Sequence, residues 1–345
     1  MRVYKYRSNE ETFLERDLNT ISQNRFFAST FENLNDPFEA NFNELISESV
    51  KILETIFKVD AQDVNKGFKE ILNFKDRLGI MSLSKTVLSE QMWAYYSNSN
   101  KGYCIEYDFE RISERNLNYD LAFSFNISYK DILPVLTIED IRNGKAPKKM
   151  FGVKKEHWQH EQEIRLIFDS SSLKEHHESA ITGIYFGYLA TDDLISALKE
   201  KFENRDVAFY KITPNRKINI LEFAEYERFS RKLKHDISKF NFELVKTKNS
   251  SAIASYYLFV RGEYAKDGLL ELARSFVEEH CYKPSNIYLL NSKASQVLDL
   301  IDIYPKTDEE YILWADTVIA DFPFDSGEIF LEPFKDYRYK ELKGL

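Results

Sequence analysis

The chain has 345 residues, of which 43% are hydrophobic and 30% are charged, and its net charge is −9. This length suits two domains better than one, and the acidic excess argues against an extended nucleic-acid footprint. Two cysteines are too few for a disulfide framework or a cysteine zinc cage. The first residues lack the apolar core of a signal peptide, and no apolar run approaches the roughly 20 residues of a membrane helix. We therefore expect a cytoplasmic protein without membrane contact.

The first two thirds of the chain alternate short apolar runs with turn residues. In chain order, the patterns predict strand 2–7, helix 11–21, strand 25–30, helix 44–77, strand 78–85, a helix capped by Ser89, strand 101–109, strand 123–132, strand 158–168, strand 181–187, helix 190–202 and strand 206–212. Many short strands with few helices between them favour an α+β fold with short-stranded mixed sheets and flanking helices over a doubly wound parallel sheet.

The residue pattern changes after about residue 222. A strand–helix–strand unit over 256–291 is followed by helical patterns at 294–301 and 309–322, and then by a turn and a strand at 325–334. We therefore divide the chain into a domain over 1–222, which carries the candidate pocket, and a smaller α+β domain over 223–345. The second domain has no chemical motif, and its separate pattern suggests that it binds a partner protein or regulates the first.

The stretch WQHEQEIRLIF, residues 158–168, places Glu161, Glu163 and Arg165 at every second position. If the stretch is a strand, these three side chains share one face, and the apolar residues between them point to the core. One interpretation is a solvated face with an exposed ion pair, which contributes little stability. The other is a pair of carboxylates directed into a site. The stretch alone leaves both open.

Further side chains are candidates for a binding pocket. Each also has a purely structural explanation, because polar residues stabilise turns and aromatic rings fill cores. These candidates are Asn35, Asp36, Ser82, Ser84, Trp93, Tyr95 and Trp158. The spacing of His157 and His160 suits neighbouring positions on a helix, but the His-Glu-x-x-His motif is absent and no metal site is predicted.

Taken in order, several motifs resemble a known family. The motifs VYKYRS, LNDPFE, MSLSK, MWAYYSNSNKGYCIEYD, ISYK, KKEHWQHEQEIRLI and ITGIYFG are similar to those of the bacterial proteins catalogued as domain of unknown function 2971, over about residues 2–220. The chain departs from this family at Tyr95, where members often carry histidine. The resemblance implies a family but no activity, and it does not reach 223–345.

The order of parts also resembles that of ADP-ribosyltransferases. In those enzymes an early strand carries His, Arg or Tyr, a later strand carries hydroxyls, and a final strand carries a catalytic Glu. The matching stretches here are YKYR, MSLSK and HEQEIR. The resemblance implies an ADP-ribosyltransferase-like fold with NAD as co-substrate and without a metal.

This second resemblance also implies roles for individual residues. Glu163 would stabilise the positive charge that develops on the ribose when the nicotinamide bond breaks, and Glu161 would orient or deprotonate the acceptor. The pyrophosphate would be bound by Arg7 or Arg165, and Ser82 would support the site. The rings that would stack on nicotinamide or adenine are those of Tyr6, Trp93 or Tyr95.

We therefore expect an NAD-dependent ADP-ribosyltransferase or NAD-cleaving enzyme, such as a bacterial toxin or anti-phage effector. Its acceptor, whether protein, RNA or small molecule, is not encoded in a readable motif. Two alternatives remain. The first is a non-enzymatic protein that senses a nucleotide or binds a partner. The second is a nuclease in which Asp36, Glu39, Glu161 and Glu163 hold Mg²⁺.

Overall fold

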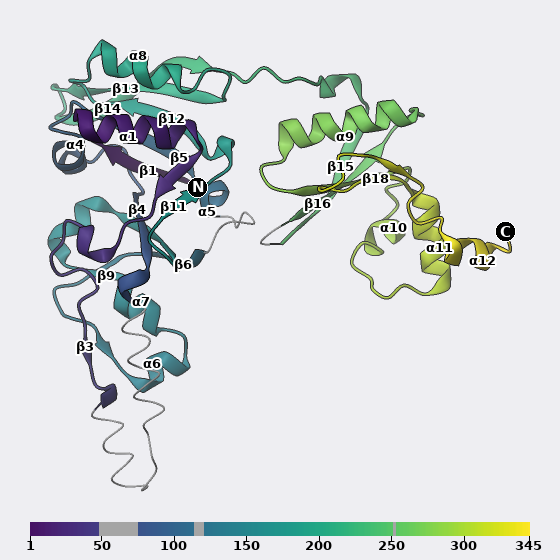
Figure 1. Cartoon of the computed structure of the whole chain (residues 1–345), viewed down its shortest axis with the longest axis horizontal. Helices are drawn as coiled ribbons and strands as arrows, with labels where there is room; N and C mark the ends of the chain where they lie inside the picture. The colour runs from purple at the N-terminus through teal and green to yellow at the C-terminus, as the bar shows by residue number, and fades with distance from the viewer. Residues whose placement is uncertain (48–74, 114–120, 251–252) are drawn as a thin grey trace, which may run out of the picture. The chain divides into compact units, whose positions relative to one another are not determined.

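The computed structural model describes residues 1–47, 75–113, 121–250 and 253–345, and Figure 1 shows their path. They form two compact units, Met1–Arg231 and Lys232–Leu345. The predicted division at 222/223 falls inside strand β14, Ile220–Phe229, which belongs to the first unit. Most of the helix predicted over 44–77 lies outside the described residues.

The first unit is built on one eight-stranded sheet, in the order β14-β13-β12-β5-β1-β4-β10-β6. In chain order its strands are β1 Arg2–Arg7, β4 Gly79–Ser84, β5 Tyr103–Asp108, β6 Leu121–Asn126, β10 Glu163–Phe168, β12 Ile181–Phe186, β13 Val207–Asn215 and β14 Ile220–Phe229. Neighbouring strands are antiparallel except β12 and β13. The α+β class is therefore confirmed, whereas the likeness to ADP-ribosyltransferases stays a prediction.

Short elements surround this sheet. The helices are α1 Glu11–Ser22, α4 Glu90–Tyr96, α5 Phe109–Ser113, α6 Ile138–Arg142, α7 Ala146–Phe151 and α8 Asp192–Glu200, and the 3-10 helices include η2 Lys75–Arg77 and η3 Glu156–Glu161. Three small pairs of strands are β2 Arg25–Phe27 with β11 Leu173–Glu175, β3 Asn43–Glu44 with β8 Val135–Leu136, and β7 Ser128–Tyr129 with β9 Val153–Lys154. The predicted cap of α4 is confirmed, because the Ser89 side chain accepts from the Met92 amide. Among the described residues, no helix is both long and apolar enough to cross a membrane.

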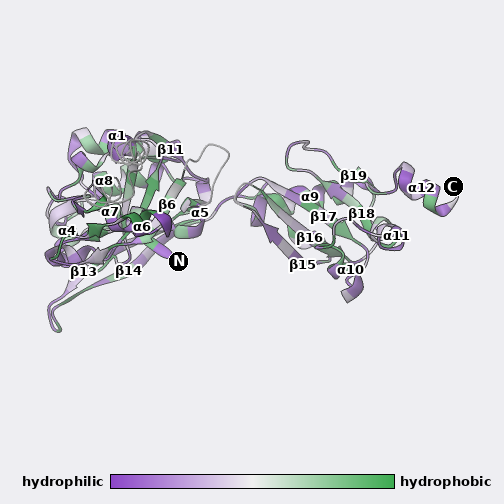
Figure 2. Ribbon diagram, turned by 90° about the horizontal axis from the view of Figure 1, so that it is seen from below, coloured by the Kyte–Doolittle hydropathy of each residue, from purple (hydrophilic) through white to green (hydrophobic). Residues whose placement is uncertain are grey.

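The two faces of the sheet have different cores. The largest core packs α1 and α8 against one face, through residues such as Ile21 and Leu198 (Figure 1). Tyr6 and Trp93 belong to an aromatic cluster on the opposite face. In Figure 2 the hydrophobic residues concentrate on the strands of this sheet. Burial of these apolar side chains is the main force that holds the unit together.

The pairing of β1 with β4 is interrupted. β1 pairs with β5 along its whole length, from Arg2 to Arg7, and β4 pairs with β10 along its whole length. In contrast, β1 and β4 share a single register pair, Tyr4 with Ser84. Continuous ladders keep strands about 4.8 Å apart, so a ladder with one pair means that the strands diverge. This divergence, called here the sheet split, runs from Lys5 to the end of β1.

Gly102 lies close to the backbone of Arg7, the last residue of β1. A Cβ atom at Gly102 would lie 2.1 Å from the backbone oxygen of Arg7. We expect Gly102→Ala to lower the free energy of unfolding by about 1–3 kcal/mol, because backbone atoms cannot yield as a side chain does. Urea denaturation measures this effect. Gly268→Ala is the control, since its Cβ would meet only Tyr264 side-chain atoms at 3.4 Å or more and alanine favours a helix. An unchanged midpoint for Gly102→Ala would contradict the close approach.

His176 makes the first unit sensitive to acid. Its side chain is 4% exposed, Nδ1 donates to the His177 carbonyl at 2.8 Å, and Nε2 is buried without a hydrogen-bond partner. Burial lowers the pKa of His176 to about 4. The unfolded chain therefore takes up this proton first, and stability falls by about 3 kcal/mol as the pH drops from 6.5 to 4. Denaturation midpoints across this range test the effect: His176→Phe should show a correspondingly weaker pH dependence, and an identical dependence would contradict the assignment.

The second unit has its own five-stranded sheet, in the order β15-β16-β17-β18-β19. Its elements are β15 Phe242–Asn249, β16 Ala254–Val260, α9 Lys266–His280, β17 Ser285–Leu290, α10 Ser295–Asp299, α11 Asp308–Thr317, β18 Val318–Phe322, β19 Phe330–Leu331 and α12 Tyr337–Lys343. The core against α9 contains Leu272 and Phe276, and a second core contains Trp314 of α11.

One prediction in the second unit is wrong. The helix predicted over 309–322 ends at Thr317, and Val318–Phe322 forms β18. The apolar spacing of this stretch fits either element, but Val318 and Ala320 are buried in alternation with more exposed residues. Pairing with β17 on one side and β19 on the other decides in favour of the strand.

Candidate active site

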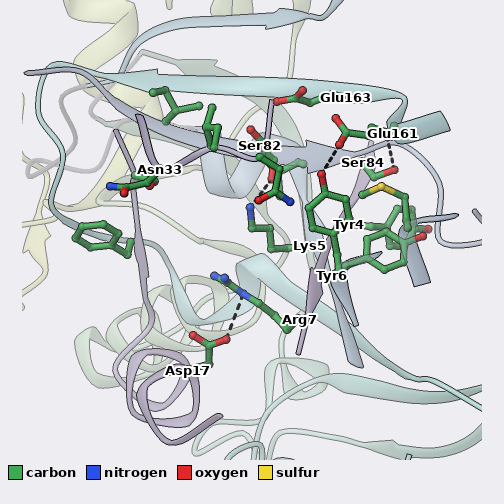
Figure 3. Close-up of a pocket in the computed structure, with 18 of the residues that line it drawn as sticks. Tyr4, Lys5, Tyr6, Arg7, Asp17, Asn33, Ser82, Ser84, Glu161 and Glu163 are labelled. Carbon is green, nitrogen blue, oxygen red and sulfur yellow. Dashed lines mark hydrogen bonds and ion pairs between the residues drawn. The ribbon is translucent and has the colours of Figure 1, made fainter. Parts of the chain in front are cut away.

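A cavity of about 300 Å³ lies at the sheet split. It is walled by β1, β4, β10, α1, α4 and η3, and Figure 3 shows the side chains that point into it. Seven of the predicted site residues line this cavity: Tyr6, Arg7, Asn35, Ser82, Ser84, Glu161 and Glu163. Residues that are far apart in the chain are thus brought to one site.

The cavity draws its walls from both faces of the sheet. Successive residues of a strand point to opposite faces. Tyr6 packs against Trp93 on one face, and Val3 packs in the core of the other. Lys5 and Arg7 share the face of Val3. An intact ladder would separate the two faces, so the sheet split is what joins them in one cavity.

The carboxylates lie on the face of Tyr6. Glu163 is the register partner of Ser84, and Ser84 is the register partner of Tyr4. Cross-strand partners point the same way, so Glu163 and Tyr4 share a face. The cavity therefore has a cationic side at Lys5 and Arg7 and a carboxylate side on the opposite face, as Figure 3 shows.

Arg165 holds Glu163 in place. Its side chain is fully buried, and its Nε and Nη2 donate to the two oxygens of Glu163 at 2.9 and 3.0 Å. Its Nη1 and Nη2 donate to the two oxygens of Glu39 at 3.0 and 2.9 Å, and Nη1 also donates to the Phe151 carbonyl at 2.9 Å. All five N–H donors are thus used. The interpretation as a solvated strand face is wrong, because Glu163 is 3% exposed.

Lys154 joins three carboxylates. Its Nζ lies 2.6 Å from Glu161, 3.2 Å from Glu39 and 3.6 Å from Glu163. The other oxygen of Glu161 accepts from the Tyr96 hydroxyl at 2.5 Å. Three carboxylates and two cations, Arg165 included, leave this buried group with one excess negative charge. We call these five charged residues the ion network.

Glu161 reaches the ion network by a route that differs from the prediction. It ends the 3-10 helix η3 instead of lying on a strand, and Gln162 follows with φ 45° and ψ 47°. This left-handed residue turns the chain before β10 begins at Glu163. The Ser84 hydroxyl fixes the bend by donating to the Glu161 backbone oxygen at 2.7 Å.

The ion network sets the charge state of the carboxylate side. Burial alone would raise the pKa of Glu163, but the adjacent Arg165 and Lys154 lower it to about 2. Burial also opposes the charge of Lys154, and the surrounding carboxylates overcome this and raise its pKa. Glu163 is therefore a fixed anion in the cavity wall, and it is not a group that exchanges a proton near neutral pH.

Five predicted site residues lie outside the cavity lining. Asp36 accepts from the Phe38 amide at 2.9 Å, which is turn chemistry, and Arg165 acts through Glu163. Trp93 is fully buried and donates to the Val87 carbonyl at 2.7 Å. Tyr95 is 66% exposed. The ring of Trp158 packs against Lys154, whose Nζ lies 4.7 Å from the ring centre.

The turn of α4 explains why its predicted rings do not reach the cavity. Met92 and Tyr96, four residues apart, line the cavity. Side chains at this spacing share one helix face, whereas Trp93 and Tyr95 point elsewhere. The stacking role predicted for Trp93 and Tyr95 therefore has no geometric support, and the ring of α4 that lines the cavity is that of Tyr96.

Sequence reasoning missed three residues of the site: Lys5, Asp17 and Lys154. Lys5 could have been found, because it alternates with Arg7 on the same predicted strand face. Asp17 lies on α1, and its carboxylate oxygen is 3.4 Å from the Nε of Arg7. Nothing near Lys154 in the sequence indicates that it is buried among carboxylates.

Comparison with known proteins identifies a family over part of the chain. A family model described as "Protein of unknown function (DUF2971)" matches residues 92–166, so the predicted resemblance is confirmed there. The matched segment runs from α4 to β10 and contains Tyr96 and four of the five members of the ion network. No curated protein and no solved structure matches the chain.

Proposed function

We propose that the chain binds an NAD-type dinucleotide at the sheet split and cleaves its nicotinamide–ribose bond, transferring ADP-ribose to an acceptor or to water. The observation that carries this proposal is a fixed anion, Glu163, facing the cationic side of the same cavity. NAD has the matching charges, because its diphosphate is anionic and its nicotinamide–ribose end carries a positive charge that moves from the ring to the ribose as the bond breaks.

Cleavage of the nicotinamide–ribose bond requires little proton transfer by the protein. The bond between ribose C1′ and the nicotinamide nitrogen breaks, its electron pair stays on that nitrogen, and the cationic ring leaves as neutral nicotinamide. The positive charge moves to the ribose, where a nearby carboxylate stabilises it. An acceptor hydroxyl or water then forms a bond to C1′ and releases its proton to solvent. A carboxylate that stays ionised suits this step.

The other residues take supporting roles in this proposal. Arg7 binds the diphosphate, and the ring of Tyr6 contacts the nicotinamide end. Glu161, which Tyr96 and Lys154 hold in place, orients the acceptor. Ser82, on the neighbouring strand β4, favours the ionised form of Glu163 and so helps to keep its pKa low. The acceptor and any role as a toxin or anti-phage effector stay predictions.

A second candidate function is binding without turnover. It is favoured by one observation: every carboxylate oxygen of Glu163 and Glu161 already accepts from a protein group. Such a site can recognise a nucleotide without reacting. The nuclease alternative fits less well, because Lys154 already lies among Glu39, Glu161 and Glu163, where a cation would have to bind.

Turnover of NAD by the purified full chain separates these candidates. The proposal predicts released nicotinamide that persists in chelator. Binding of NAD without nicotinamide would favour the sensor, and nucleic-acid cleavage lost in chelator would favour the nuclease. Absence of both NAD binding and NAD cleavage would overturn the proposal.

A further inference from the structure

Lys5 is an ammonium without a counter-ion. Its Nζ donates to the backbone oxygen of Ser82 at 2.9 Å, across the sheet split. Among the residues that the structure describes, it forms no ion pair with a carboxylate. A lysine has three donors, so two remain for another partner. Removing an ammonium from water without an opposite charge is unfavourable, and such groups in proteins are normally paired.

No neighbouring carboxylate forms an ion pair with Lys5 among the residues that the structure describes. The charged groups that act on Lys5 are Arg7 on β1, Asp17 on α1, Glu161 on η3 and Glu163 on β10. The two glutamates are already held by Lys154 and Arg165. Asp17 lies 3.4 Å from Arg7 and 3.0 Å from Arg16, and it also accepts from Tyr103. Each carboxylate near Lys5 therefore already has another cation as its ion-pair partner.

Arg7 extends the same positive surface. It lies two residues after Lys5, so both side chains point to one face of β1. Its Nε is buried and lies 3.4 Å from an Asp17 oxygen as an ion pair, without a hydrogen bond. Both residues line the cavity, with Arg16 beside them. The split exposes this surface to the cavity interior, where a ligand would be partly shielded from water.

We propose that Lys5 and Arg7 form a seat for a phosphate or diphosphate group, and that the ligand supplies the counter-ion that Lys5 lacks. This inference rests on the proposed function for the identity of the rest of the ligand. Phosphate oxygens accept several hydrogen bonds at once, which suits one ammonium and one guanidinium on neighbouring positions. Lys5 thereby selects phosphorylated ligands over the corresponding nucleosides.

This seat makes ligand binding depend on pH. Burial, with Arg7 nearby, lowers the pKa of Lys5 to about 8. The ammonium is the form that attracts an anion, so affinity should fall as the pH rises from 7 through 8 to 9. A ligand without phosphate should show no such decline.

The test measures the binding of three probes to the full chain: inorganic diphosphate, ADP-ribose and adenosine. Lys5→Met should weaken the two phosphorylated probes at least about tenfold and leave adenosine unchanged. It should also abolish the decline in affinity between pH 7 and 9. Lys5→Arg keeps the charge and should retain binding without this decline. Lys101→Met, at an exposed position outside the cavity lining, is the matched control.

The outcomes separate this inference from the proposed function. Equal affinity of Lys5→Met and the wild type for both phosphorylated probes would overturn the seat. If NAD were still cleaved in that case, the proposed function would stand alone. Binding of diphosphate that depends on Lys5, without release of nicotinamide, would support the seat and leave the cleavage without support. Binding of inorganic diphosphate but not ADP-ribose would point to a free anion as the ligand and overturn selection of a nucleotide.

Discussion

Replacing Arg165 with methionine is expected to lower the free energy of unfolding of the first unit by about 3–5 kcal/mol. Methionine fills part of the same volume but supplies none of the five donors. Glu39 and Glu163 would remain buried with Lys154 as their one cation, so the excess charge of the ion network would change from −1 to −2. Breaking a buried pair on one side is far more destabilising than replacing both partners.

Urea denaturation measures this effect. In a Trp314→Phe background the remaining tryptophans, Trp93 and Trp158, both lie in the first unit, so their emission reports its unfolding. Arg25→Met is the matched control, because Arg25 and its partner Glu175 are 39% and 44% exposed and such pairs contribute about 1 kcal/mol or less. A loss for Arg165→Met no larger than that of the control would show that the ion network does not hold the site together.

Replacing Glu163 with glutamine is expected to lower the rate of nicotinamide release by about 10²–10³-fold. Glutamine keeps the shape of the side chain and one accepting oxygen for Arg165, which also retains Glu39. The variant loses the fixed negative charge beside the developing positive charge. Because that charge acts mainly in the transition state, we expect a smaller effect on the affinity for NAD than on the rate.

Glu106→Gln is the control for this variant. Glu106 is a buried carboxylate on β5 of the same sheet, outside the cavity lining, and it accepts from Thr182 and Tyr185 at 2.7 and 2.8 Å. Its rate of nicotinamide release should match that of the wild type once the folded fraction is equal. If Glu163→Gln released nicotinamide as fast as Glu106→Gln, the role assigned to Glu163 would be refuted.

Local patterns predicted much of the first unit. The β1 strand, α1 and the Ser89 cap of α4 follow from spacing and capping chemistry, and the structure confirms them. The error at Val318–Phe322 arose because apolar spacing over a short stretch fits a helix and a strand alike. Which element forms there depends on neighbouring strands that are far away in the sequence.

The sequence predicted many of the residues that form the candidate site, but it did not predict how they are arranged. Glu161 and Glu163 do meet, but a left-handed Gln162 brings them together, and strand alternation does not. The burial of Lys154 among carboxylates and the divergence of β1 from β4 are tertiary events without a local signal. The alternation of Lys5 with Arg7 could have placed Lys5 at the site. That Lys5 lacks an ion-pair partner can be seen only in the folded structure, where its neighbours are known.

A crystal structure of the full chain with ADP-ribose tests the central claim most directly, which is that the sheet split is the ligand site. The account predicts the diphosphate against Lys5 and Arg7, with the ribose C1′ beside Glu163. ADP-ribose bound elsewhere on the chain, or a β1–β4 ladder that closes and removes the cavity, would contradict it.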